Sequence, residues 1–150
     1  MRSPLKPGAT IGILGGGQLA RMLAHLLAVV IEPDATSRRV SLGDNVLHDF
    51  YRELRCRTVD VVRLSRDLDM WVDDEGAIVM DPEVNHASTA IAHLHGHDGQ
   101  PYFGPALFTG GADEAGDSVG LSEAMAEQLE TWAATVHEAL PHVDQHDAKE

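Results

Sequence analysis

Short, β-rich apolar runs recur along most of this chain, and turn-forming residues separate them. The runs are VVI at 29–31, RRVSL at 38–42, VDVVRL at 59–64, MWV at 70–72, AIVM at 77–80 and YFGPALFT at 102–109. Residues 33–37, between VVIE and RRVSL, are rich in turn formers, which is typical of a hairpin whose second strand ends near Leu42. The sequence therefore predicts an α+β domain on a mostly antiparallel sheet, built from residues near 29–42, 59–80 and 102–121.

Two or three helices are expected to pack on this sheet. The clearest one begins after Ser122, a good N-cap residue, and ends before Pro141. Its apolar residues fall at spacings of three and four and form one stripe: Met125, Leu129, Trp132, Val136 and Leu140. Such a helix buries a single face, as a helix that covers a sheet does.

Two shorter helices and a hairpin are also expected. One helix crosses residues 47–54, and another follows Asn85 or Ser88, since either residue can cap it. The residues of the second helix expected to face inward are Ala90, Ile91 and Leu94. Residues 70–80 are expected to form a hairpin whose turn uses Gly76 with a positive φ.

The first residues have a different character from the rest. The run TIGIL at 10–14 meets three glycines, and a helical spacing of apolar residues follows: Leu19, Met22, Leu23, Leu26 and Leu27. This expected helix meets the next β-rich run without a loop. We therefore expect an N-terminal appendage at 1–28, a single α+β domain at 29–141 and a polar tail at 142–150.

The charge is acidic and unevenly distributed. The chain has 24 Asp and Glu against 11 Lys and Arg, a net charge of −13, and 18 of the acidic residues lie in residues 66–150. Negative charge opposes binding to nucleic-acid phosphates and to anionic lipid, so no direct nucleic-acid or membrane partner is expected. A basic protein is the expected partner, although an acidic surface could instead imitate DNA phosphates.

The cysteine content favours a reducing, cytoplasmic setting, and the hydropathy predicts no membrane span. Cys56 is the single cysteine, so no intramolecular disulfide can form, and an ordinary thiol is expected. The longest apolar stretch, from Leu19 to Ile31, is interrupted by Arg21 and His25. It is shorter than the roughly 20 residues that span a bilayer.

The glycine turn is a candidate phosphate-binding site. It comprises Gly15, Gly16, Gly17 and Gln18. The segment matches Gly-x-Gly-x-x-Ala between an expected strand and helix, where backbone N–H groups can hold the phosphates of a nucleotide such as ATP. Glu32 and Asp34 follow near the spacing at which dinucleotide-binding folds hold a ribose. The alternative is a tight turn that needs glycine only for its own backbone.

A histidine-rich segment is the candidate metal site. Its members are His93, His95, His97 and Asp98. Imidazoles two residues apart point the same way in an extended chain, and zinc or nickel suits such ligands. The alternative is a set of solvated histidines that interact favourably with a helix C-terminus.

The first residues resemble a known enzyme family. The run LKPGATIGILGGGQLARMLA at 5–24 is similar to the opening of carboxyaminoimidazole ribonucleotide synthetase, an ATP-grasp enzyme of purine synthesis. The resemblance implies that Gly16, Gly17 and Gln18 lie where that family's first domain meets its substrate. The domains of that family that hold ATP, magnesium and catalysis have no counterpart here, so this chain is not expected to work alone as that enzyme.

A second resemblance covers residues 29–122. The runs VVIEPD, VDVVRLSRDLDMWVDDEGAIVMDPEVNHASTAIAH and YFGPALFTGGADEAGDSVGLS are similar to the bacterial and phage family called domain of unknown function 3846. The resemblance implies an order of strand, hairpin, Asn-containing helix and Gly-Pro strand. It brings no known activity.

Two function hypotheses follow. The first is a non-enzymatic binding or regulatory module, carried by a bacterium or its mobile elements, that faces a basic protein. No acid–base couple is recognisable in the sequence, which disfavours an enzyme. The alternative is nucleotide or phosphate binding at the glycine turn, in a truncated fragment of the purine-synthesis enzyme. Deleting residues 1–28 should spare the first function and abolish the second.

Overall fold

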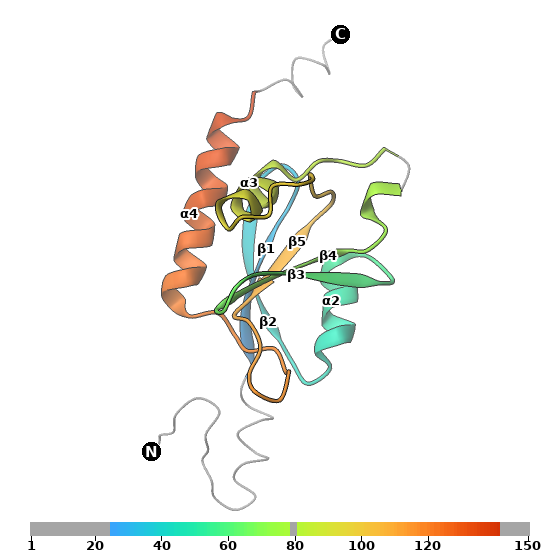
Figure 1. Ribbon diagram of the computed structural model, residues 1–150, viewed down its shortest axis with the longest axis vertical. Coiled ribbons are helices and arrows are strands. Elements are labelled where there is room, and N and C mark those ends of the chain that lie inside the picture. The colour runs from blue at the N-terminus through green and yellow to red at the C-terminus, as the bar shows by residue number, and fades with distance from the viewer. Residues whose placement is uncertain (1–24, 79–80, 142–150) are drawn as a thin grey trace, which may run out of the picture.

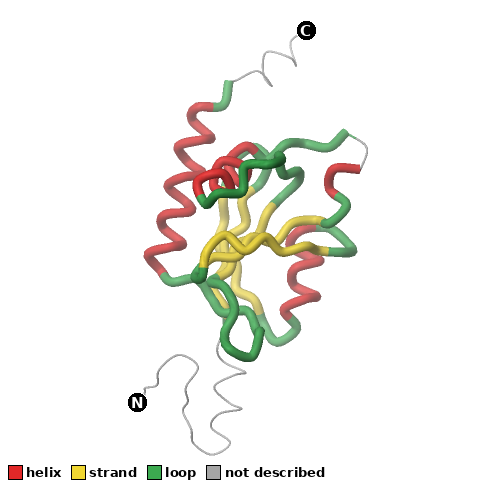
Figure 2. Tube along the Cα trace, viewed as in Figure 1, coloured by secondary structure: helices red, strands yellow, loops and turns green. Residues whose placement is uncertain are grey.

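A five-stranded sheet forms the centre of the molecule, in a computed structural model that describes residues 25–78 and 81–141. Its strands are β1 (Leu26–Ile31), β2 (Ser37–Leu42), β3 (Val59–Ser65), β4 (Leu68–Asp73) and β5 (Ala106–Thr109). Their order is β2-β1-β5-β4-β3, and all neighbours are antiparallel. The sheet twists strongly between β1 and β3 (Figure 2). The α+β prediction is confirmed.

Helices cover both faces of the sheet (Figure 1). They are α2 (Val46–Leu54), α3 (His86–Leu94) and α4 (Glu123–Ala139). The larger apolar core lies between the sheet and α3 and α4, and it includes Met70, Ile91, Phe108 and Leu129. A smaller core lies under α2 and includes Phe50, Leu54 and Leu107. The two cores make the sheet the middle of three layers.

Helix α4 follows the sequence prediction closely. Ser122 caps it, with its Oγ accepting a hydrogen bond from the Met125 N–H at 3.1 Å. Leu129 is fully buried, and the other members of the predicted stripe pack against the larger core. The helix packs against β1 and β2, which lie at the far side of the sheet from β3. The edge at β3 is therefore left for other segments to cover.

Strand β1 begins earlier than the sequence predicts. Leu26, Leu27 and Ala28 pair with β2, although the helical spacing assigned Leu26 and Leu27 to a helix and placed Ala28 at the end of an appendage. On one side this segment pairs with β2, and on the other the Leu121 N–H donates to the Leu27 carbonyl at 2.8 Å, so tertiary pairing overrides a weak helical spacing. The predicted appendage at 1–28 thus ends inside a sheet strand.

The predicted hairpin at 70–80 is wrong. β4 pairs instead with β3, and the turn between them is formed at Arg66 and Asp67, where the Asp67 N–H donates to Ser65 Oγ at 3.2 Å. Gly76 opens a short 3-10 turn at Gly76–Ile78 and has no positive φ. A Cβ at Gly76 would lie 3.1 Å from the Phe103 carbonyl oxygen, so close backbone approach is the reason for glycine there.

Helix α3 is capped by Asn85, one of the two predicted candidates, whose Oδ1 accepts from the Ser88 N–H at 2.9 Å. Ile91 is buried as predicted, but Ala90 and Leu94 are exposed, and Leu94 is 66% exposed. The buried face is instead made by Ala87, Ser88, Ile91 and Ala92. The cap is confirmed, and the predicted inward face is partly wrong.

Strand β5 is shorter than the predicted run at 102–109. Gly104 adopts a φ of +76° just before Pro105, so the chain turns there and cannot continue a regular strand backwards. The residues before Gly104 pass alongside β3 and β4 instead of joining the sheet. This path of the chain creates a groove beside β3.

Candidate functional site

The candidate site is a groove at the free edge of β3. The Thr58 carbonyl oxygen accepts from the Asp74 N–H at 3.1 Å, which shows that residue 58 faces β4. Main-chain groups alternate along a strand, so those of Val59, Val61 and Arg63 point away from the sheet. β3 therefore has an outward row of N–H and C=O groups with which no strand of the described chain pairs.

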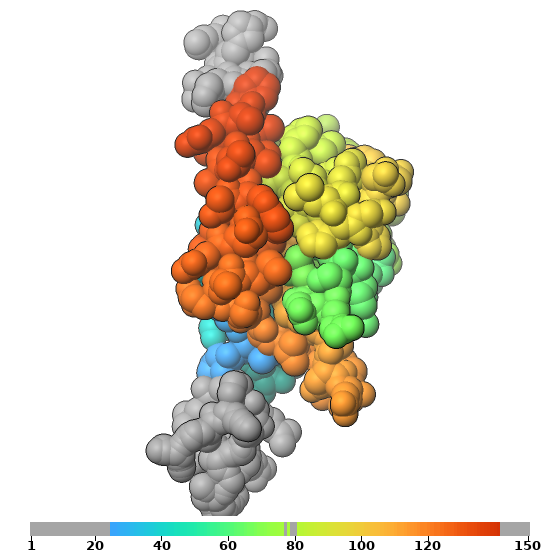
Figure 3. Space-filling model, turned by 60° about the vertical axis from the view of Figure 1, so that its left-hand side comes forward, coloured from blue at the N-terminus to red at the C-terminus, as the bar shows by residue number. Residues whose placement is uncertain are grey.

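The opposite wall of the groove is the segment of residues 97–103. Asn85 and Thr89 of the α3 region fix this segment, because the Asn85 N–H donates to the Tyr102 carbonyl at 2.8 Å and the Tyr102 N–H donates to Thr89 Oγ1 at 2.9 Å. Figure 3 shows the surface around α3 (yellow) beside that of β3 and β4 (green), with α4 (orange to red) on the other side. Hydrogen bonds to Asn85 and Thr89 thus fix the segment of residues 97–103 to the layer that contains α3.

The groove has a volume of about 600 Å³. Its lining on the β3 side comes from residues 60–63, and its lining from β4 and the following turn comes from residues 72–74 and 76. On the opposite wall the lining residues are 97 and 99–103. It is therefore a slot between a free strand edge and a fixed loop.

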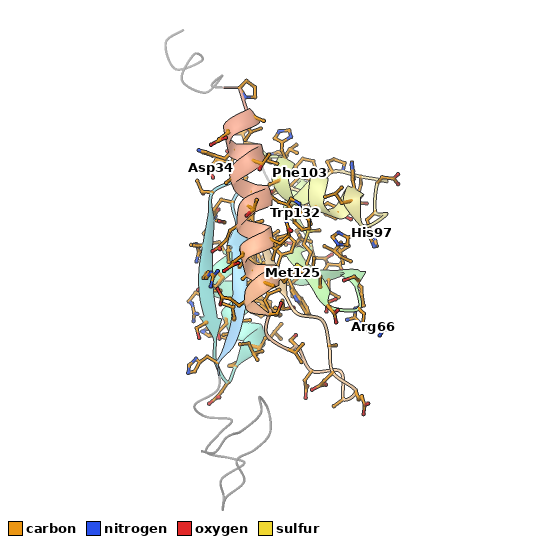
Figure 4. The ribbon with its side chains drawn as sticks, turned by 90° about the vertical axis from the view of Figure 1, so that its left-hand side faces the viewer. Asp34, Arg66, His97, Phe103, Met125 and Trp132 are labelled. Atoms are coloured by element: carbon orange, nitrogen blue, oxygen red, sulfur yellow. The ribbon has the colours of Figure 1, made fainter. Side chains whose placement is uncertain are left out.

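His97 spans this slot at one end. Its Nε2 lies 3.0 Å from the Arg63 carbonyl oxygen, and since a carbonyl oxygen only accepts, Nε2 donates this bond. In Figure 4, His97 lies beside the β3–β4 hairpin, and Arg66 lies at the outer end of that hairpin. This hydrogen bond occupies the outward-facing carbonyl of Arg63.

Carboxylates dominate the charge of the groove. Asp60, Asp73 and Asp74 line it, and within the described part of the chain none of them forms a salt bridge. The arginine in the lining, Arg63, is engaged elsewhere, because its Nε lies 3.1 Å from Oδ1 of the buried Asp69. The groove therefore presents negative charge that no described cation neutralises.

The pKa of Tyr102 responds to this negative charge. Burial raises the pKa of its phenol, and the charge of Asp60 raises it further. Asp60 itself accepts from the Val61 N–H at 3.0 Å, so its carboxylate occupies one of the outward-facing donors of β3. Main-chain acceptors, a carboxylate and the apolar Val62, Val72 and Tyr102 thus line one groove, which suits a ligand with cationic and hydrogen-bonding groups.

The predicted histidine cluster is spread over several partners. His93 is exposed on α3, and His95 Nδ1 lies 2.8 Å from the Ile91 carbonyl oxygen. His97 reaches β3, while Asp98 is exposed. Among the residues that the structure describes, no group of three or more His, Cys, Asp or Glu side chains is placed to hold a metal ion. Zinc binding stays a prediction and would require His95 and His97 to leave their carbonyl contacts.

The other candidates divide between described and undescribed residues. Gly15, Gly16, Gly17 and Gln18 lie outside the described residues. Glu32, the predicted ribose ligand, accepts from Arg55 at 2.9 Å. Burial and the charge of Asp73 raise the pKa of the Cys56 thiol, which makes it less nucleophilic, as expected for an ordinary thiol.

Sequence reasoning missed the groove itself. The sequence predicts Asp60 as part of a strand and Tyr102 as the start of another, and only the turn at Gly104 brings the two together. A weak signal was present: Asp60 interrupts the apolar run VDVVRL on the face that a buried strand would keep apolar.

Comparisons with known proteins give little information on function. The family described as Domain of unknown function (DUF3846) matches residues 26–134. N5-carboxyaminoimidazole ribonucleotide synthase of Brucella melitensis biotype 1 is 52% identical over 40 residues, which cover 23% of this chain and 11% of that protein. Both resemblances noted in the sequence are confirmed, but the chain spans only about a tenth of that relative. No solved structure matches the chain significantly. Of the helices described, none has the length and apolar character needed to cross a membrane.

Proposed function

This chain belongs to the DUF3846 family, and we propose that it is a non-enzymatic binding or regulatory module for a basic protein segment. The groove along β3 is the proposed binding site. The observation that carries the proposal is that Asp60 and Asp74 line this groove without a salt bridge in the described chain. We place its action in the cytoplasm, where a single-cysteine protein needs no disulfide.

The arginines of the described chain support this assignment through their positions. Arg38 and Arg39 of β2 form salt bridges at the opposite edge of the sheet from β3, and Arg55, which follows α2, pairs with Glu32. Carboxylates outside the groove therefore neutralise the charges of these arginines. A cationic ligand would find its complement at Asp60 and Asp74, and long-range attraction would speed its association.

A binding measurement with hexa-arginine tests the proposal. Fluorescence anisotropy of the labelled peptide with the full chain should give saturable binding that weakens as salt increases. The double variant Asp60→Asn with Asp74→Asn should raise the Kd about tenfold, because two favourable charge interactions are removed. Asn keeps an acceptor oxygen for the local hydrogen bond of Asp60.

The matched control removes the same charge elsewhere. Glu127 and Glu138 are exposed on α4, do not line the groove and form no salt bridge in the described chain. The double variant Glu127→Gln with Glu138→Gln should bind hexa-arginine nearly as the parent does. Equal weakening by both double variants would mean that only net charge matters, and the proposed site would be wrong.

A second function is favoured by the match to the purine-synthesis enzyme. We propose it as the alternative: the glycine turn Gly15 to Gln18 binds a phosphate or nucleotide. The 52% identity over 40 residues supports it. Thermal unfolding of the full chain and of a variant lacking residues 1–24, each with and without ATP, tests it. A shift of the midpoint confined to the full chain is expected, and no shift in either protein would refute it.

A further inference from the structure

We propose that the groove receives its ligand as an added antiparallel strand on β3, supplied by an extended segment of a basic protein with Lys or Arg at alternate positions. This inference rests on the proposed function and specifies how the ligand is held. β3 is an edge strand, and an edge strand pairs readily with a further chain.

The main chain of β3 carries the first part of the argument. The carbonyls of Val59 and Val61 point outward, away from β4. In the described chain neither accepts a hydrogen bond. The Val61 N–H is held by the Asp60 carboxylate of its own strand. An incoming strand would offer N–H groups to both carbonyls and a carbonyl to the Val61 N–H.

The side chain of Asp60 carries the second part. When an incoming carbonyl takes over the Val61 N–H, the Asp60 carboxylate is released to pair with a cation. Residues directly opposite in antiparallel strands lie on the same face, so the ligand residue opposite Asp60 shares its face and lies near its carboxylate. The next ligand residue on that face meets Val62, beside Tyr102. The charge of the groove thus fixes which ligand residues face Asp60.

His97 sets the length of the added strand. Because its ring occupies the Arg63 carbonyl, pairing ends before residue 63. The ligand strand therefore forms main-chain hydrogen bonds with Val59 and Val61. Its residue opposite Asp60 is a non-hydrogen-bonded position, with an N–H that points away from β3.

This geometry allows a test that separates main-chain pairing from charge. The probe is a labelled seven-residue peptide of alternating Thr and Arg, measured by fluorescence anisotropy with the full chain. Two derivatives keep every charge: one is N-methylated at each Thr, and the other at each Arg. In the proposed register, Thr N–H groups donate to Val59 and Val61, while Arg N–H groups point outward.

Methylation at Thr should raise the Kd about tenfold, since two main-chain hydrogen bonds are lost. Methylation at Arg, where the N–H groups point away from β3 toward residues 97–103, should raise the Kd clearly less than methylation at Thr. If both derivatives bind as the parent does, the ligand is held by charge alone and strand addition is overturned, while the proposed function stands. If the parent peptide itself fails to bind, or binds equally to the Asp60→Asn, Asp74→Asn variant, the proposed function fails as well.

The chain's own first residues are a competing occupant of the groove. Residues 1–24 contain Arg2, Lys6 and Arg21 and no acidic residue. If the peptide binds only after residues 1–24 are removed, that segment takes the groove and the proposal of a partner protein is overturned. Equal binding by the full chain and by the shortened variant is the expected result.

Discussion

The two free edges of the sheet use charge in opposite ways. At β2, arginine side chains are clamped from both faces: Arg38 Nη1 lies 2.6 Å from Glu53 of α2, and Arg39 Nε lies 2.9 Å from Glu130 of α4. At β3, Asp60 and Asp74 line an open groove with no salt bridge among the described residues. Both strands end the same sheet, but only the β3 edge keeps unneutralised charge beside exposed main-chain acceptors.

The difference shows that overall acidity does not locate a binding surface. The net charge of −13 is a property of the whole chain, whereas folding pairs most described arginines with carboxylates near β2 and α2. What matters for a ligand is the charge left over in a concave place. In this protein that place is the slot between β3 and residues 97–103.

The largest expected effect comes from removing the first residues of β1, which pair with the end of β2. A variant that lacks residues 1–28 loses Leu26, Leu27 and Ala28, which pair with Leu42, Ser41 and Val40. We expect a loss of about 3 kcal/mol or more, a large part of the roughly 5–15 kcal/mol that stabilises a domain. Thermal unfolding checks this. A variant that lacks only residues 1–24 keeps all of β1 and should melt within a few degrees of the full chain, and equal melting of both variants would contradict the strand assignment.

The next effect concerns the wall of the groove. Asn85 is fully buried, and its Nδ2 donates to the Ile31 and Gly104 carbonyls at 2.9 and 2.8 Å. Asn85→Ala leaves these carbonyls without a donor and removes the α3 cap, so urea unfolding should show a loss of about 2–4 kcal/mol. The exposed cap of α2 is the control: Asn45→Ala should cost about 1 kcal/mol or less. A smaller loss at Asn85 than at Asn45 would contradict its anchoring role.

A smaller effect is expected at the β2 clamp. Hydrogen bonds from Arg39 hold the pKa of Glu130 below its ordinary value of 4.5. A lowered pKa stabilises the fold above the ordinary glutamate pKa, and this stabilisation is lost as the pH falls through the lowered value. Arg39→Gln should therefore lower Tm modestly at pH 7, and the difference from the parent should vanish in acid. Arg66→Gln, which removes an arginine that forms no salt bridge in the described chain, should show no such pH dependence.

The smallest effect concerns the electrostatics of the groove. Asp60→Asn should lower the pKa of Tyr102, since the Asp60 charge is the second cause of its rise, but burial should keep it above the ordinary value. Tyrosinate absorbance in a Tyr51→Phe background measures it, because Tyr51 is the other tyrosine. Asp67→Asn is a control outside the groove lining. An unchanged Tyr102 pKa in Asp60→Asn would mean that Asp60 does not act on the groove.

The sequence predicted those elements whose formation depends on residues close together in the chain. The stripe of α4, the caps at Ser122 and Asn85 and the turn between β1 and β2 follow from spacing and cap chemistry. The pairing partner of β4 did not, because Arg66 and Asp67 form a turn without the glycine that a sequence reader looks for. The start of β1 differs from the prediction because pairing with the distant residues Val40 to Leu42 of β2 decides it.

The candidate site was less predictable than the fold. Its residues come from β3, from β4 and from the loop at residues 97–103, and they meet because Asn85 and Gly104 redirect the chain. A histidine pattern drew attention to residues 93–98, yet the His97 ring contacts a strand edge instead of the other histidines. The histidine spacing therefore identified one residue of the groove, His97, but predicted the other histidines as its neighbours instead of Arg63.

The most direct test of the account is a map of amide chemical shifts during titration of the full chain with hexa-arginine. The account predicts that the largest changes fall on the groove, at Val61, Arg63, His97 and Gln100, while β2 around Arg39 changes little. Changes spread evenly over the acidic surface, or centred on α4, would contradict the claim that the β3 edge is the binding site.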